Sequence, residues 1–314
     1  MNPSPGSWTR RVLLANIVVE VGIVVSGGLV RLTGSGLGCP TWPQCVPGSY
    51  VPVVEQAEGF HKYIEFGNRT LTGVVGIAAL LALVAVWRLN RPRLRVVAAL
   101  PLVGVVTQAV IGGITVRTGL HPATVAVHFA VSMLIIVASV VLLLRVDEGD
   151  GPPQPVVPLP VRQLAWLLAG TCAAVLLLGT VVTGSGPHSG DADEPARFAL
   201  DPRTISWLHA DLVLLFLGLV VGLMVALALV HAPWVARRRA RWVLGVTLAQ
   251  GLIGYVQYAT DLPEALVLLH MLGASLLTVT VTGLLMSLRH RPVVGPAAGP
   301  GGRTAVSVTQ AAPG

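Results

Sequence analysis

The chain has 314 residues, of which 54% are apolar and 11% are charged, and its mean hydropathy is +0.76. This composition excludes an ordinary soluble domain and indicates an integral membrane protein in contact with lipid. The formal net charge of +7 does not indicate a nucleic-acid partner, because the basic residues lie between and beside apolar segments.

Eight apolar segments are long enough to cross a hydrocarbon core of about 30 Å as helices of roughly 20 residues. They lie at residues 11–31, 63–87, 95–117, 122–145, 162–184, 205–231, 240–259 and 264–289. Their continuous apolar character favours helices over a β-barrel, because lipid cannot satisfy open backbone groups. The sequence therefore predicts an all-α integral membrane protein with eight transmembrane helices.

The placement of charge predicts the orientation of these helices. Fifteen of the 21 lysines and arginines fall on one side of the eight-span arrangement. The positive-inside rule makes that side cytoplasmic, so we expect a multi-pass protein of the cell membrane with both termini in the cytoplasm. Residues 146–161, rich in Pro, Gly and Asp, form a cytoplasmic linker between halves 1–145 and 162–291, and the tail 292–314 is expected to be disordered.

The two halves carry an internal repeat. Residues Gln108–His128 align without gaps with Gln250–His270, with 8 identities in 21 positions, and the closing histidine is one of them. The Thr-Gly-Ser-Gly sequence of Thr33–Gly36 recurs at Thr183–Gly186. A duplicated unit of four helices predicts two pseudo-symmetric four-helix bundles.

Two cysteines lie in the longest predicted outer loop. Cys39 and Cys45 are separated by five residues, and the oxidising compartment outside the cytoplasm permits a disulfide between them. The bond could simply stiffen a Pro-rich loop. It could instead be redox-active, because exposed small-loop disulfides tend to be labile.

Two histidines of the second half indicate a prosthetic group. His209 and His270 lie near the outer ends of two predicted helices at similar depth, and neither has an obvious acidic partner. An ionisable residue inside the membrane is costly and usually functional. Two neutral imidazoles facing each other across a bundle form a suitable bis-histidine site for haem iron.

The first half is less regular. His128 corresponds to His270, but the counterpart of His209 falls at Asn68, and an amide is a weak ligand for iron compared with imidazole. His61 lies two helical turns before Asn68, roughly 10 Å away along the axis. The iron is therefore held by His128 alone or with His61, and a haem with an open axial position can perform chemistry.

Charged residues near this position allow more than one role. Glu65 shares a helix face with Asn68. It could form a structural pair with Arg69, or it could handle protons or orient the substrate beside the haem. Arg31, Arg69 and Arg117 lie at outer helix ends, where a guanidinium could bind haem propionates or simply extend to the membrane surface.

Several segments together resemble the haem A synthase family over nearly the whole chain. The segments are Gly27–Cys45, Ile64–Gly73 and the surroundings of His128, His209 and His270. The resemblance implies an enzyme with eight helices in two halves. It would oxidise the C8 methyl group of haem O, through an alcohol, to the formyl group of haem A, the haem of haem-copper cytochrome oxidases.

The resemblance also implies roles for particular residues. His209 and His270 would bind haem B, His128 and the position of Asn68 would form the catalytic first-half site, and Glu65 would be the functional glutamate. Cys39 and Cys45 would be the outer-loop cysteine pair. Asn68 departs from the pattern, since better-known members carry histidine there. The implied partners are haem O synthase, cytochrome oxidase assembly and an unidentified electron-transfer partner.

Two other functions remain compatible with a membrane helix bundle. A di-haem cytochrome b-like electron-transfer subunit is the main alternative, but it commonly needs two complete bis-histidine sites, which Asn68 does not provide. A transporter would also show repeats, but it favours broken helices and several acids at the membrane midplane.

Overall fold

The computed structural model describes residues 6–187, 190 and 196–293, and eight helices dominate them. The helices are α1 (Ser7–Leu32), α2 (His61–Trp87), α3 (Pro92–Arg117), α4 (Pro122–Arg145), α5 (Leu159–Ser185), α6 (Pro202–Leu229), α7 (Trp234–Ala259) and α8 (Glu264–Met286). Seven are long and apolar enough to cross a membrane, the exception being α7. The predicted all-α integral membrane class is confirmed.

Six helices begin earlier than the apolar segments that predicted them. The shift is between two and six positions and affects α1, α2, α3, α5, α6 and α7. Arginine is a good helix former, so the helix continues through polar residues that a hydropathy window excludes. In α7 the arginines at 237–239 and 241, together with two glutamines and two tyrosines, lower the hydropathy of the whole helix.

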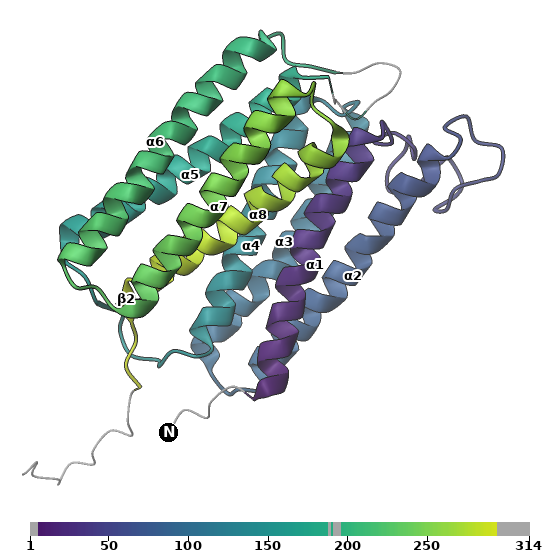
Figure 1. The fold of residues 1–314 in the computed structure, drawn as a ribbon. Helices are drawn as coiled ribbons and strands as arrows, with labels where there is room; N and C mark the ends of the chain where they lie inside the picture. The colour runs from purple at the N-terminus through teal and green to yellow at the C-terminus, as the bar shows by residue number, and fades with distance from the viewer. Residues whose placement is uncertain (1–5, 188–189, 191–195, 294–314) are drawn as a thin grey trace, which may run out of the picture.

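Each half forms a closed ring of four helices (Figure 1). In the first half α1 contacts α2 and α4, and α3 contacts α2 and α4. The second half repeats this arrangement with α5 to α8. Within the described residues α2 and α4 lie diagonally across one ring, and α6 and α8 lie diagonally across the other. This arrangement agrees with the predicted pair of pseudo-symmetric bundles.

The repeated segment is also repeated in conformation. Gly119 and Leu120, between α3 and α4, have φ angles of 59° and 56°, and Asp261 and Leu262, between α7 and α8, have φ angles of 58° and 59°. Left-handed backbone is uncommon for residues with a Cβ atom. Its recurrence at equivalent positions indicates that the two turns share one structure.

The two halves meet along α1 and α4 on one side and α5 and α8 on the other. Apolar side chains fill this interface, among them Val24, Ile136 and Met271. Gly28 allows the closest approach, since a Cβ atom there would lie 2.5 Å from Sδ of Met271. The hydroxyl of Thr278 on α8 donates to Sδ of Met133 on α4 at 3.3 Å.

The linker between the halves is more structured than predicted. Strand β1 (Gln154–Pro155) pairs antiparallel with β2 (Arg289–His290) just after α8, and α5 begins at Leu159 instead of 162. Buried Arg91 donates to Asp150 and to the carbonyl oxygens of Val146 and Glu148. The linker therefore ties both halves together at this end, which is also where α1 begins (Figure 1). Most of the predicted disordered tail, residues 294–314, lies outside the described residues.

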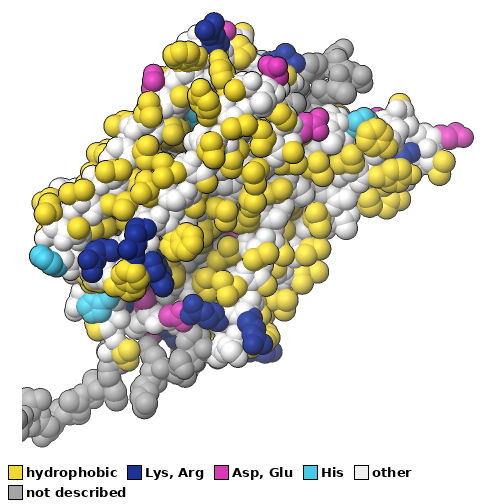
Figure 2. All heavy atoms as spheres, in the orientation of Figure 1, with side chains coloured by type: hydrophobic (Ala, Val, Ile, Leu, Met, Phe, Trp, Pro, Cys, Tyr) yellow, Lys and Arg dark blue, Asp and Glu magenta, His cyan; other side chains and the backbone are white. Residues whose placement is uncertain are grey.

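Hydrophobic side chains cover the length of the bundle on the face shown in Figure 2, and a group of Lys and Arg lies near the β2 end. Large apolar residues such as Leu214, Val221 and Leu229 of α6 are exposed. Exposed apolar side chains along the whole length of a helix are expected where lipid is the solvent.

Candidate functional site

The second-half histidines come from diagonal helices of one ring. His209 lies on α6 and His270 on α8, which face each other across the second ring of helices. The imidazole of each histidine packs against a glycine of a neighbouring helix. A Cβ atom on Gly179 of α5 would lie 3.3 Å from Cε1 of His209, and one on Gly254 of α7 would lie 3.4 Å from Cε1 of His270. The structure thus brings together the two residues predicted to bind haem B.

His128 occupies the equivalent place in the first half. It lies on α4, and a Cβ atom on Gly112 of α3 would lie 3.5 Å from its Cε1 atom. Gly112 and Gly254 are equivalent residues of the sequence repeat, so both halves place an imidazole edge on a glycine. Gln108 fixes this region by donating from Nε2 to the carbonyl oxygen of His128 at 2.8 Å and to Ser132 Oγ at 2.5 Å.

These three imidazoles share a further property. Among the described residues, the Nδ1 atoms of His128, His209 and His270 are buried without a hydrogen-bond partner. The described residues also contain no group of three His, Cys, Asp or Glu side chains that could hold a bare metal ion. These half-buried imidazoles, each set against a glycine, are available to hold a haem iron.

Asn68 lies on the inward face of α2 and is held by a neighbouring helix. Ser26 Oγ on α1 lies 2.7 Å from Asn68 Oδ1 and donates a hydrogen bond to it. Ser26 Oγ also lies 3.1 Å from the carbonyl oxygen of Ile23. The residue that replaces the expected ligand is therefore fixed by a side chain that sequence reasoning did not single out.

Glu65 and Arg69, both on α2, hold the loop that contains Cys39 and Cys45. Both oxygens of the Glu65 carboxylate are engaged. Oε2 accepts a bond of 2.6 Å from the backbone N–H of Cys39, and Oε1 accepts from Arg69 Nη2 at 2.5 Å. Arg69 also donates to the carbonyl oxygens of Cys39, Thr41 and Gln44. This geometry favours the structural alternative for Glu65, and it directs Arg69 to the loop instead of to a propionate.

The predicted disulfide between Cys39 and Cys45 is confirmed. The two residues are 0% and 1% exposed, so the bond is shielded from solvent instead of lying open in a loop. Trp42 between them covers Gly113 of α3, where a Cβ atom would lie 2.5 Å from the indole. Arg117 donates to the carbonyl oxygen of Trp42 at 3.2 Å and stacks over its ring. The disulfide loop is thus a packed cover over the outer ends of α2 and α3.

His61 and Arg31 have partners at the outer end of the bundle. Nδ1 of His61, the first residue of α2, lies 2.8 Å from Ser35 Oγ of the Thr-Gly-Ser-Gly segment. Arg31 donates to the carbonyl oxygen of Thr183 in the other half at 3.0 Å. The backbone N–H of Gly36 donates to Gly190, which joins the outer loops of the two halves.

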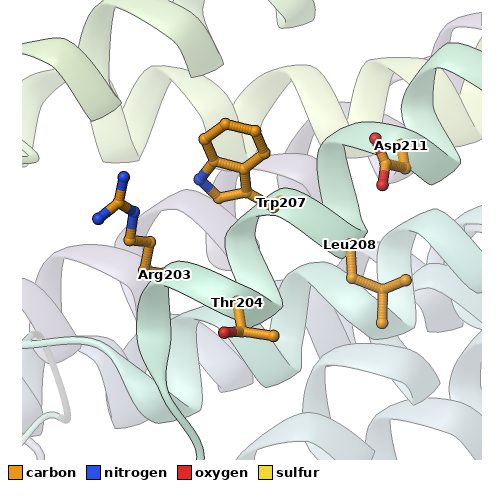
Figure 3. Close-up of a pocket in the computed structure, with 5 residues that line it drawn as sticks. All are labelled: Arg203, Thr204, Trp207, Leu208 and Asp211. Atoms are coloured by element: carbon orange, nitrogen blue, oxygen red, sulfur yellow. The ribbon is translucent and has the colours of Figure 1, made fainter.

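A surface pocket of about 480 Å³ lies on α6, but it is not the histidine site. Figure 3 shows its lining residues, Arg203, Thr204, Trp207, Leu208 and Asp211, all from the outer half of this helix. Asp211 is two residues after His209, a rotation of about 200° on a helix, so the two side chains point in nearly opposite directions.

Comparison with known proteins supports the haem interpretation. Residues 10–282 match the family described as cytochrome oxidase assembly protein (COX15-CtaA). The chain belongs to this family. A heme A synthase of Halalkalibacterium halodurans is 26% identical over 304 residues, which cover 91% of this chain and 99% of that protein.

Two other relatives of the family match a smaller part of the chain. A heme A synthase of Shouchella clausii is 36% identical over 135 residues, or 42% of this chain and 43% of the relative. One of Alkalihalophilus pseudofirmus is 28% identical over 186 residues, or 56% of this chain and 61% of the relative. These two alignments span less than two thirds of the relatives, whereas the alignment with the Halalkalibacterium protein spans nearly all of it. The family predicted from the sequence is confirmed.

A polar cluster at the middle of α1 was missed by sequence reasoning. Asn16 donates to Glu20 Oε1 at 2.8 Å and to Ser139 Oγ of α4 at 3.0 Å, and Ser139 donates to Glu20 at 2.7 Å. All three residues are at most 3% exposed. An acid in the centre of an otherwise apolar segment was the signal that could have identified this cluster.

Proposed function

We propose that this chain is a membrane-bound haem A synthase, which oxidises the C8 methyl group of haem O to the formyl group of haem A. The observation that carries the proposal is the pair of half-buried imidazoles of His209 and His270 on diagonal helices, in a member of this family. The names of the relatives favour this function over a di-haem cytochrome b-like subunit. Asn68 argues against that alternative as well, because it leaves the first half with one fewer imidazole.

The second half would hold haem B through His209 and His270. A haem held by these two residues would supply one-electron transfer. Gly179 and Gly254 leave room for the two imidazole edges, and an apolar core lies between the four helices of this half. A low-dielectric surrounding of this kind is one of the properties by which a protein sets a haem potential.

The first half would hold the substrate haem O through His128. Gln108 anchors the backbone of this ligand, and Gly112 leaves room for its ring. We assign Glu65 and Arg69 to holding the disulfide loop over the outer end of the site, because both side chains are fully engaged with that loop. His61 is the first residue of α2, two helical turns or roughly 10 Å along the axis from Asn68, so we propose that it does not hold the iron and that His128 would hold it alone.

The proposed reaction defines the neighbouring steps. Haem O must come from a haem O synthase, and haem A must pass to the assembly of a haem-copper cytochrome oxidase. An electron-transfer partner is also required, because conversion of a methyl to a formyl group is a four-electron oxidation. With water as the oxygen source it releases four electrons and four protons to an acceptor, whereas with O2 as the source a donor must supply electrons. We place the protein in the cell membrane with both termini in the cytoplasm, on the basis of the arginines near the β2 end.

The proposal is tested by haem analysis. The chain is produced in cells that make haem O but no haem A, and the extracted haems are separated by reverse-phase chromatography. A formyl-bearing haem is expected only when the chain is present. His209→Ala and His270→Ala should each remove the low-spin haem B spectrum from the purified protein, whereas His290→Ala, an exposed histidine at the opposite end of the bundle, should retain it. Haem O as the sole product of the intact chain would refute the proposed activity.

A further inference from the structure

The contact between Ser26 and Asn68 determines which end of the amide is engaged by a neighbouring helix. Oδ1 of Asn68 lies 2.7 Å from the Ser26 hydroxyl, which is its donor. The Nδ2 group is on the other branch of the amide and is therefore directed away from Ser26. An amide NH₂ offers two hydrogen-bond donors and no lone pair for a metal.

The two halves differ in what a neighbouring helix places beside Asn68 and beside its counterpart, His209. In the second half α5 presents Gly179 beside His209, and this leaves space for an imidazole edge. In the first half α1 presents the hydroxyl of Ser26 beside Asn68. Thus a glycine lies beside the histidine, whereas a hydroxyl group lies beside the asparagine. The surroundings of Asn68 are therefore suited to holding an amide in one orientation, and the residue is not simply a histidine lost from an unchanged site.

The strip of α2 that carries Asn68 faces the inside of the ring. Glu65 and Val75 on the same strip are buried, and Glu65 is already bound to the disulfide loop. Its charge is neutralised by Arg69 within the same helix. Asn68 is thus the side chain of this strip that retains hydrogen-bonding capacity at the level of the missing ligand.

We propose that Asn68 is a hydrogen-bond donor over the open axial face of the first-half haem, and that Ser26 is the residue that positions it. The inference rests on the proposed function, since it requires a haem held by His128. An amide N–H at this place stabilises a small anion or water at the open coordination position, whereas an imidazole would occupy that position itself. The first half is then built to accept a small ligand that the second half excludes.

Fluoride is a suitable probe, because it binds ferric high-spin haem and accepts hydrogen bonds. The purified ferric protein with both haems is titrated with fluoride and followed by absorption. The bis-histidine haem of the second half does not bind fluoride, so it is an internal reference. Asn68→Leu, which keeps the size and removes the donors, should weaken fluoride binding by about tenfold, the effect of losing one hydrogen bond to an anion.

Variants of Ser26 separate positioning from packing. Ser26→Ala should weaken fluoride binding by about three- to tenfold, and Ser26→Thr, which keeps the hydroxyl, should restore it. Thr107→Val, which removes an exposed hydroxyl bonded only within α3, is the matched control and should leave fluoride binding unchanged. Asn68→His should convert the haem to a low-spin form that no longer binds fluoride.

The possible failures can be told apart. A chain that contains only the bis-histidine haem contradicts the proposed function. A chain with two haems, neither of which binds fluoride until His61 is replaced by alanine, overturns the inference by showing that His61 is the ligand. Fluoride binding that is equally strong in the intact chain, Asn68→Leu and Ser26→Ala overturns it as well, while leaving the proposed function in place.

Discussion

The polar cluster of Asn16, Glu20 and Ser139 in the first half can be compared with the corresponding residues of the second half, and the comparison predicts how variants of the cluster change stability. Matched by burial, Leu168 and Cys172 of α5 take the places of Asn16 and Glu20 of α1, at an offset two residues larger than that of the Thr-Gly-Ser-Gly repeat. The sequence repeat places Val281 of α8 at Ser139, and these three second-half residues all belong to an apolar core. At these three positions the second half is therefore apolar.

Removing one member of the cluster should destabilise the bundle. Ser139→Ala deletes a hydroxyl that donates to Glu20 and accepts from Asn16. Buried polar groups that lose a partner cost about 1–3 kcal/mol, and interhelical hydrogen bonds in membranes contribute about 0.6 kcal/mol on average. We expect a loss of about 1–2 kcal/mol for this variant.

Replacing all three residues of the cluster with apolar side chains should not lower the stability of the bundle and could raise its free energy of unfolding. The triple variant Asn16→Leu, Glu20→Met and Ser139→Val matches the apolar character of the second half. Apolar replacement of a complete buried polar network is often neutral or stabilising by about 1–4 kcal/mol. The triple variant should therefore be at least as stable as the unaltered chain and clearly more stable than Ser139→Ala.

Unfolding in mixed micelles, with helicity followed against the mole fraction of denaturing detergent, measures both differences. Each variant is compared with the unaltered chain in the same haem-loaded state. A triple variant that is less stable than Ser139→Ala would refute the reasoning, because it would show that the polar network stabilises this interface more than apolar packing does.

Two further predictions concern the outer side of the protein. Arg69→Ala removes the bonds that hold the disulfide loop, so Cys39–Cys45 should be reduced by a soluble thiol at least about tenfold faster, as thiol labelling over time would measure; an unchanged rate would contradict the proposed holding role. Hydrogen bonds from the Thr204 side chain and backbone N–H hold the pKa of Asp201, the N-cap of α6, below its usual value. Since a lowered pKa in the folded state stabilises only the ionised cap, its contribution is present above the ordinary aspartate pKa of about 3.9 and is lost as the pH falls through the lower folded value. As the pH is lowered through this range, the melting temperature should fall more steeply for the unaltered chain than for Asp201→Asn. Parallel curves of melting temperature against pH would show that the cap does not contribute.

The site illustrates which contacts a sequence can predict. His209 and His270 could be proposed as a ligand pair from the sequence because a histidine in an apolar segment is conspicuous and its depth in the helix can be read from the chain. The roles of Glu65 and Arg69 were left open. A side chain at the outer end of a helix can face the bundle, the loop or the lipid, and only the folded loop around Cys39 shows which one applies.

The amino-acid sequence by itself determined the number of helices, the duplication, the disulfide partners and the family, because each depends on the composition and spacing of residues along the chain. The tertiary structure decided that Ser26 holds Asn68, that Ser139 meets a glutamate 119 residues away, and that β1 pairs with β2. Such contacts depend on the rotation and tilt of each helix against its neighbours. Hydrophobic periodicity sets only weak limits on that rotation in a protein whose outer surface is as apolar as its core.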